Sequence, residues 1–100
     1  MSDETSKLLP IGTVLKLQKV EKPIMIYGRN QRQQKTNNIY DYIGVPYPEG
    51  NLTEDFNVFF NRGIIDKIIH LGLTSPEEVL MREKVEGDLR KSHKGSTYEN

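Results

Sequence analysis

The chain has 100 residues, with 14 basic and 14 acidic side chains and therefore a formal net charge of zero. This length predicts one domain, and the balanced charge argues against a protein built mainly to hold nucleic acid or to lie on an anionic membrane. Because cysteine is absent, disulfide bonds, thiolate metal sites and cysteine nucleophiles are excluded. No apolar run approaches a membrane span, and no signal peptide is recognisable, so a cytoplasmic protein is expected.

Both ends of the chain are polar and hold almost no core-forming residues. We therefore expect residues 1–7 and 92–100 to be disordered. Residues 8–91 remain as a single α+β domain, which is close to the size at which a hydrophobic core is marginal. Stabilisation by a partner is physically plausible for such a small core.

Five segments have the alternation or β-branched and aromatic content of strands. The expected strands cover residues 11–18, 23–29, 39–45, 56–60 and 67–71. The pattern over residues 66–73 is too short to separate a strand from a helix, and a strand is favoured. Residues 61–65 are consistent with one helical turn. The polar segment 29–38 has no apolar anchor, so it is expected to be a mobile loop.

The last element has a clear start signal for a helix. Ser75, Pro76 and Glu78 occupy the N-cap, N1 and N3 positions of a capping box, and Pro76 stands where its missing N–H costs nothing. The helix should run from Pro76 to about Leu89, with an apolar stripe that includes Met81 and Val85. The expected fold class is α+β: a bent, roll-like antiparallel sheet of four to five strands with one C-terminal helix.

Few residues offer chemistry. Asp41 falls on an apolar face of a predicted strand, so a hydrogen-bonded partner is the simplest expectation and an acid–base role is the weaker one. His70 lies in an apolar run and His93 in the expected tail, and neither has neighbours at metal-ligand spacing. No nucleotide, hydrolase or metalloprotease motif is present, so we predict a non-enzyme without catalytic residues, cofactor or metal.

The segment Tyr40–Asn51, YDYIGVPYPEGN, resembles the signature of a small uncharacterised-domain family of Gram-positive bacteria. The opening Leu9–Val14 and the FFN, IDKI and GL groups between residues 59 and 73 are similar to the remainder of that pattern. Arg62–Gly63 departs from it, because an acidic residue often follows the Phe-Phe-Asn group. Members of this family are encoded beside LXG toxins in type VII secretion loci, where they resemble accessory or targeting chaperones.

The resemblance implies a partner that is a protein, the helical LXG domain of a toxin, with or without a second small helical accessory protein. It implies no nucleic acid, membrane or small-molecule substrate. Large amphipathic or apolar side chains are the natural contacts for such a partner. The residues predicted to contact it are Tyr42, Tyr47, Glu49, Met81 and Val85.

Three alternatives stay open. The protein could be an immunity protein that blocks the toxin. It could be a small nucleic-acid-binding barrel that uses Arg29, Arg32 and Lys35, although no aromatic residues are interleaved with these cations. It could also be an enzyme that pairs Asp41 with a distant base.

Overall fold

The computed structural model describes the backbone of residues 7–96 and the side chains of residues 7–91. The strands are β1 (Val14–Leu17), β2 (Ile24–Arg32), β3 (Ile39–Pro46), β4 (Val58–Phe60) and β5 (Ile65–His70). Two short 3-10 helices, η2 (Glu54–Phe56) and η3 (Arg62–Ile64), flank β4, and one helix, α1 (Pro76–Ser96), ends the described chain. Within residues 7–96, none of the helical segments is long and apolar enough to cross a membrane.

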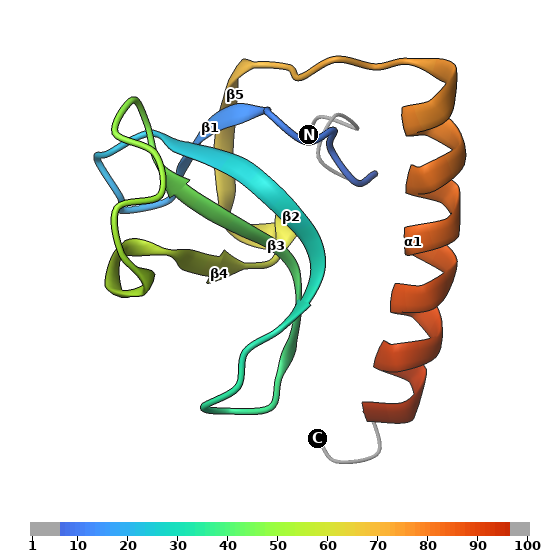
Figure 1. The fold of residues 1–100 in the computed structure, drawn as a ribbon. Coiled ribbons are helices and arrows are strands. Elements are labelled where there is room, and N and C mark those ends of the chain that lie inside the picture. The colour runs from blue at the N-terminus through green and yellow to red at the C-terminus, as the bar shows by residue number, and fades with distance from the viewer. Residues whose placement is uncertain (1–6, 97–100) are drawn as a thin grey trace.

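The five strands form one antiparallel sheet in the order β4-β3-β2-β1-β5. Strands β1 to β4 follow one another as a meander, and β5 then returns to pair with β1. The turn η3 makes this return, and Gln18 N–H donates to the Ile64 carbonyl across a 2.9 Å hydrogen bond. Figure 1 shows the strongly bent sheet with α1 standing beside it. The α+β prediction, a bent antiparallel sheet with one C-terminal helix, is confirmed.

Two segments of uncertain or polar pattern are strand in the structure. The undecided segment 66–73 is a strand as far as His70. The expected loop 29–38 is shorter, because β2 continues to Arg32, which pairs with Ile39 of β3. Strands pair through backbone hydrogen bonds, which do not require apolar side chains. The polar composition of residues 29–32 therefore did not indicate that they form a strand.

The main core lies on the face of the sheet that the segment before β1 and α1 cover. Its buried members come from the segment before β1, from all five strands and from α1: Leu8, Leu9, Leu15, Leu17, Ile24, Ile26, Tyr42, Phe60, Ile65 and Leu89. A second buried row, Val14 and Val45, faces the opposite side, since both pair with Met25 in the register. Strand β3 is covered on both sides, since its residues 41–45 are all buried.

The helix begins as expected and ends later than expected. Ser75 Oγ accepts a 3.1 Å hydrogen bond from Glu78 N–H, which confirms the N-cap. The backbone then stays helical to Ser96, beyond the expected end at about Leu89 and into the expected tail 92–100. No proline follows Pro76, and Lys, Arg and Glu favour helix. Residues 1–6 and 97–100 lie outside the described residues.

Candidate protein-docking site

The guanidinium of Arg62 joins the sheet to the helix. Asp41 of β3 is buried and accepts three hydrogen bonds from Arg62: from the backbone N–H at 2.9 Å, from Nε at 3.0 Å and from Nη2 at 3.3 Å. The other end of the guanidinium donates to Glu86 of α1, with Nη1–Oε2 at 3.1 Å. One arginine thus satisfies a buried carboxylate and fixes the middle of the helix against η3.

This arrangement also sets the charge states of its members. Burial alone would lower the pKa of Arg62, but its hydrogen bonds to Asp41 and Glu86 raise that pKa above the ordinary value. Partial burial acts to raise the pKa of Glu86, yet the bonds from Arg62 and from Leu8 N–H lower it below 4.5. The pair is therefore fully charged at neutral pH.

A second ionic group holds the start of the helix. Arg29 of β2 donates from Nη1 to Glu78 Oε2 at 2.8 Å, and the Arg29 side chain is only 5% exposed. Arg82, one turn further along α1, donates from Nη2 to the other oxygen of Glu78 at 3.1 Å. The two cations therefore share one carboxylate, which ties the first turns of α1 to β2.

The segment Lys7–Pro10, here called the strap, runs between the sheet and α1 (Figure 1). Leu8 N–H donates to Glu86 Oε2 at 3.0 Å, and Leu9 N–H donates to the Tyr42 hydroxyl at 2.8 Å. The Leu9 carbonyl accepts from Arg29 Nη1 at 3.2 Å. The strap is therefore bonded to both ionic groups, and its two leucines fill the space below the helix.

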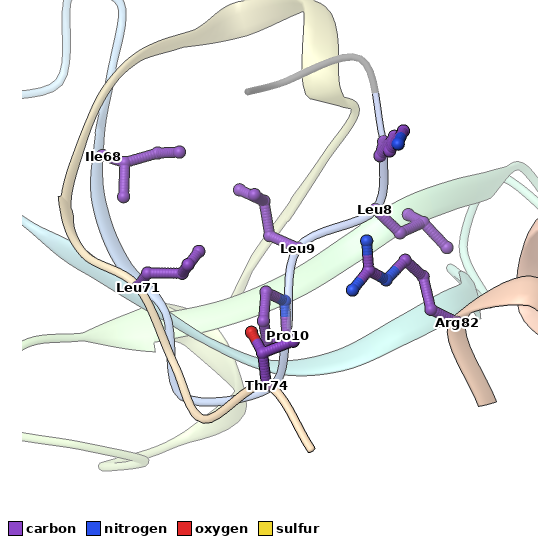
Figure 2. Close-up of a pocket in the computed structure, with 8 residues that line it drawn as sticks. Leu8, Leu9, Pro10, Ile68, Leu71, Thr74 and Arg82 are labelled. Carbon is purple, nitrogen blue, oxygen red and sulfur yellow. The ribbon is translucent and has the colours of Figure 1, made fainter. Parts of the chain in front are cut away.

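A pocket of about 430 Å³ opens beside the strap. Its lining consists of Lys7, Leu8, Leu9, Pro10, Ile68, Leu71, Thr74 and Arg82. Figure 2 shows Ile68 and Leu71 on one side of the strap and Arg82 of α1 on the other. This space, called the strap pocket below, has apolar walls and two cationic side chains, with no acidic residue in its lining.

Exposed apolar side chains occur on the connection to α1 and on its first turns. Leu71, Leu73, Leu80 and Met81 are between 51% and 80% exposed. Ile11 is close to this connection, since a Cβ added at Gly72 would meet the Ile11 carbonyl. A concentration of exposed apolar residues beside a pocket is typical of a surface that binds another protein.

Residues 8–81 match the family described as a domain of unknown function, DUF4176. The chain belongs to this family. Comparison with curated proteins and with solved structures finds no match. In this DUF4176 protein, the matched region ends inside α1, so Glu86 and Leu89 lie beyond it, although both help to dock the helix on the domain.

Tyr42, predicted as a partner contact, is placed differently by the DUF4176 fold. Its ring is fully buried beside Phe60, at a centroid distance of 5.2 Å, and its hydroxyl is taken by Leu9 N–H. Desolvation by burial raises the pKa of Tyr42 to about 12. The correction follows from β3 being covered on both sides: Tyr42 is a core residue here, with no surface to offer a partner.

The other predicted contacts fall into two separate places. Tyr47 and Glu49 are exposed on the connection between β3 and β4, and Glu49 pairs with Lys22 at 2.7 Å. Met81 is exposed on α1, whereas Val85 is half-buried against the core. Figure 1 shows the β3–β4 connection and α1 on opposite sides of the molecule. One small partner segment therefore cannot contact both places.

Several residues considered above for catalysis or nucleic-acid binding already have partners within the protein. Asp41 has Arg62 as its partner, as the hydrogen-bonding expectation required. Arg29 is paired with Glu78, and Arg32 donates to Asn37 Oδ1 at 2.9 Å. His70 is exposed on β5, and residues 7–91 contain no group of three or more His, Asp or Glu that could hold a metal. The His93 side chain lies outside the described residues.

Sequence reasoning missed the residues that assemble this site. In the sequence, Arg62 stands out only as a departure from the family pattern, and Arg29 only as a cation at the start of an expected loop. Leu8 and Leu9 precede the first expected strand, and no local pattern marks them as a strap. One signal was available: Glu78, Arg82 and Glu86 repeat at intervals of four residues, which places them on one face of a helix.

Proposed function

We propose that this protein is a non-catalytic binding protein that serves as an accessory or targeting chaperone for an LXG-type toxin of a type VII secretion system. It acts in the cytoplasm on the helical N-terminal domain of the toxin, with or without a second small helical accessory protein. No cofactor or small-molecule substrate is required for this role.

The observation that carries this proposal is the exposed apolar surface of the α1 side. Leu71, Leu73, Leu80 and Met81 are each more than half exposed, although the domain has few apolar residues to spare. A long amphipathic helix can cover such residues by laying its own apolar face on them. The strap pocket, which Leu71 lines, supplies a recess in which a side chain of that helix can anchor.

The choice of client rests on the resemblance of Tyr40–Asn51 to domains encoded beside LXG toxins. The geometry supports binding in general, and the resemblance selects the toxin. Much of that run, from Asp41 to Val45, is buried, so these residues stabilise the fold. The partner would then bind to other residues, which are on the surface.

The rival functions are less well supported by the contacts. A nucleic-acid barrel needs accessible cations on β2, but Arg29 is buried in an ion pair. An enzyme using Asp41 needs a free carboxylate, but Arg62 occupies it. An immunity protein remains an alternative, because it also binds the toxin, at the catalytic end.

Co-purification with the two halves of the toxin encoded by the neighbouring gene tests the proposal. Binding to the N-terminal half alone supports it, and binding to the C-terminal half alone supports immunity instead. Met81→Asp should weaken N-terminal binding about tenfold or more, the cost of losing a central apolar contact. Leu52→Asp is the matched control, because Leu52 is equally exposed, at 55%, on the β3–β4 connection. Equal losses of affinity in both variants would contradict the assignment of the binding surface to the α1 side.

A further inference from the structure

The strap pocket combines an apolar recess with a cationic rim. Five of its eight lining residues are apolar: Leu8, Leu9, Pro10, Ile68 and Leu71. A volume of about 430 Å³ lies within the range of pockets that hold small ligands or anchoring side chains. The strap itself forms part of the wall, and its hydrogen bonds from Leu8 N–H to Glu86 and from Leu9 N–H to Tyr42 hold it there.

The two charged residues of the strap-pocket lining, Lys7 and Arg82, are both cations, and both also line an adjoining recess with Glu83 and Glu86. Lys7 has no ion-pair partner in the described part of the chain. Arg82 shares Glu78 with Arg29, and its buried Nε has no hydrogen-bond acceptor among the described residues. A guanidinium has five N–H donors, so Arg82 retains donors for another acceptor. A carboxylate at this rim would gain charge-assisted hydrogen bonds.

The apolar surface continues beyond the pocket. Leu71 lines the recess and is half exposed, and Leu73, two residues on, is 80% exposed. A free small molecule could fill the recess but would leave these side chains in water. A polypeptide segment can fill the recess with one side chain and cover the neighbouring leucines with an adjacent side chain.

We propose that the strap pocket binds a segment of the partner protein in which an apolar side chain enters the recess and an adjacent acidic residue pairs with Arg82 and Lys7. This inference rests on the proposed function, because it describes how the protein client is recognised. It commits to an apolar–acidic polypeptide segment as the occupant. A free aliphatic carboxylate and a second copy of this chain are the alternatives that the experiments must exclude.

The first experiment uses small probes on the intact, isotopically labelled protein. N-acetyl-leucine has both an apolar side chain and a carboxylate, whereas N-acetyl-leucinamide lacks only the charge. N-acetyl-leucine should shift the NMR signals of Leu9, Leu71, Thr74 and the Arg82 Nε–H, and the amide should bind at least about fivefold more weakly. Equal affinities, or shifts confined to other regions, would overturn the cationic-rim argument. Octanoate binding that far exceeds N-acetyl-leucine binding would favour a free lipid-like ligand and overturn the peptide reading.

The second experiment uses the N-terminal half of the toxin and two matched pairs of variants. Leu71→Glu should reduce its affinity at least about tenfold, since it places a negative charge at the recess, whereas Leu52→Glu, on the β3–β4 connection, should change it less than about threefold. Lys7→Glu should likewise weaken binding, whereas Lys91→Glu, at an exposed site on α1, should not. All four positions are exposed, so thermal melting should confirm that the fold is retained.

The two levels of the proposal fail in different ways. If the toxin half binds but Leu71→Glu and Lys7→Glu leave its affinity unchanged, the strap pocket is not the docking site, although the chaperone function survives. If N-acetyl-leucine occupies the pocket but no toxin half binds, the site stands and the client is a different protein. A change of oligomeric state in Leu71→Glu, measured by light scattering, would instead identify a second copy of the chain as the occupant and overturn the proposal.

Discussion

Arg62 of η3 and Glu86 of α1 lie 24 residues apart in the sequence, yet their side chains meet at 3.1 Å between Nη1 and Oε2. The same guanidinium holds the buried carboxylate of Asp41. The contact decides how α1 sits on the domain, and α1 in turn forms one wall of the strap pocket through Arg82. A change at Arg62 should therefore affect both stability and the shape of the pocket.

Arg62→Met should lower the free energy of unfolding by about 2 to 4 kcal/mol, because it leaves Asp41 charged and buried without its partner. The Arg62 side chain is 24% exposed, so solvent screening keeps the loss below that of a fully buried pair. Urea denaturation followed by circular dichroism measures it. The double variant Asp41→Asn with Arg62→Met should recover part of the loss. Failure of Asp41→Asn to recover anything would mean that the packing of Arg62 matters more than its charge.

The pH dependence of stability should contain a contribution from Glu86. Its pKa in the folded protein is lowered below 4.5, so the folded state takes up this proton less readily than the unfolded chain. The stabilisation is fully present above pH 4.5 and is lost as the pH falls through the folded value. Wild-type protein should therefore lose stability more steeply on acidification than Glu86→Gln.

Glu49→Gln is the control for this pH profile. The pKa of Glu49 is also lowered, by the hydrogen bond from Lys22, but this pair is exposed. Salt screens exposed pairs much more than partly buried ones. At moderate ionic strength the Glu49→Gln profile should coincide with wild type, while Glu86→Gln should still differ. Coinciding profiles for all three proteins would contradict the assigned role of Glu86.

The parts of the fold that could be predicted are those encoded by neighbouring residues. The capping box places the start of α1 because Ser75 and Glu78 interact within one turn, and period-two alternation locates most of β3. The end of α1 was underestimated because no local stop signal marks it. The strap and the return of β5 to β1 depend on contacts between distant segments, which local patterns do not report.

The contact face of α1 shows why the site was harder to predict than the fold. Hydrophobicity assigned Met81, Val85 and Leu89 to one stripe facing the sheet or a partner. The observed inner face combines Val85 and Leu89 with Glu78, Arg82 and Glu86, whose partners are on β2, η3 and the strap. These ion pairs select the rotation of the helix and leave Met81 exposed. Electrostatic docking of this kind cannot be read from apolar periodicity.

Tyr42→Phe should loosen the strap. The substitution keeps the ring but removes the hydroxyl that accepts from Leu9 N–H, and leaving this buried donor unpaired costs about 1 to 3 kcal/mol. Hydrogen exchange at Leu9 should accelerate, and the unfolding midpoint in urea should fall. Tyr47→Phe is the control, because Tyr47 is exposed and the change should be nearly neutral. In ultraviolet titration of the folded protein, the component near pH 12 should disappear only in Tyr42→Phe.

Gly72→Ala should disturb the connection that leads to α1. A Cβ at Gly72 would collide with the Ile11 carbonyl, and the Gly72 N–H donates to Thr13 Oγ1 at 3.0 Å in a buried contact. Forcing a methyl group between two backbone segments costs about 1 to 3 kcal/mol. Gly63→Ala is the matched control, because a Cβ there meets no atom within 4 Å. Thermal melting should separate the two variants, and the Gly72 variant should also lose affinity for N-acetyl-leucine, since Leu71 and Thr74 on either side line the strap pocket. A Gly72 variant as stable as the Gly63 variant would show that the connection can move aside, and that it does not hold the pocket wall in place.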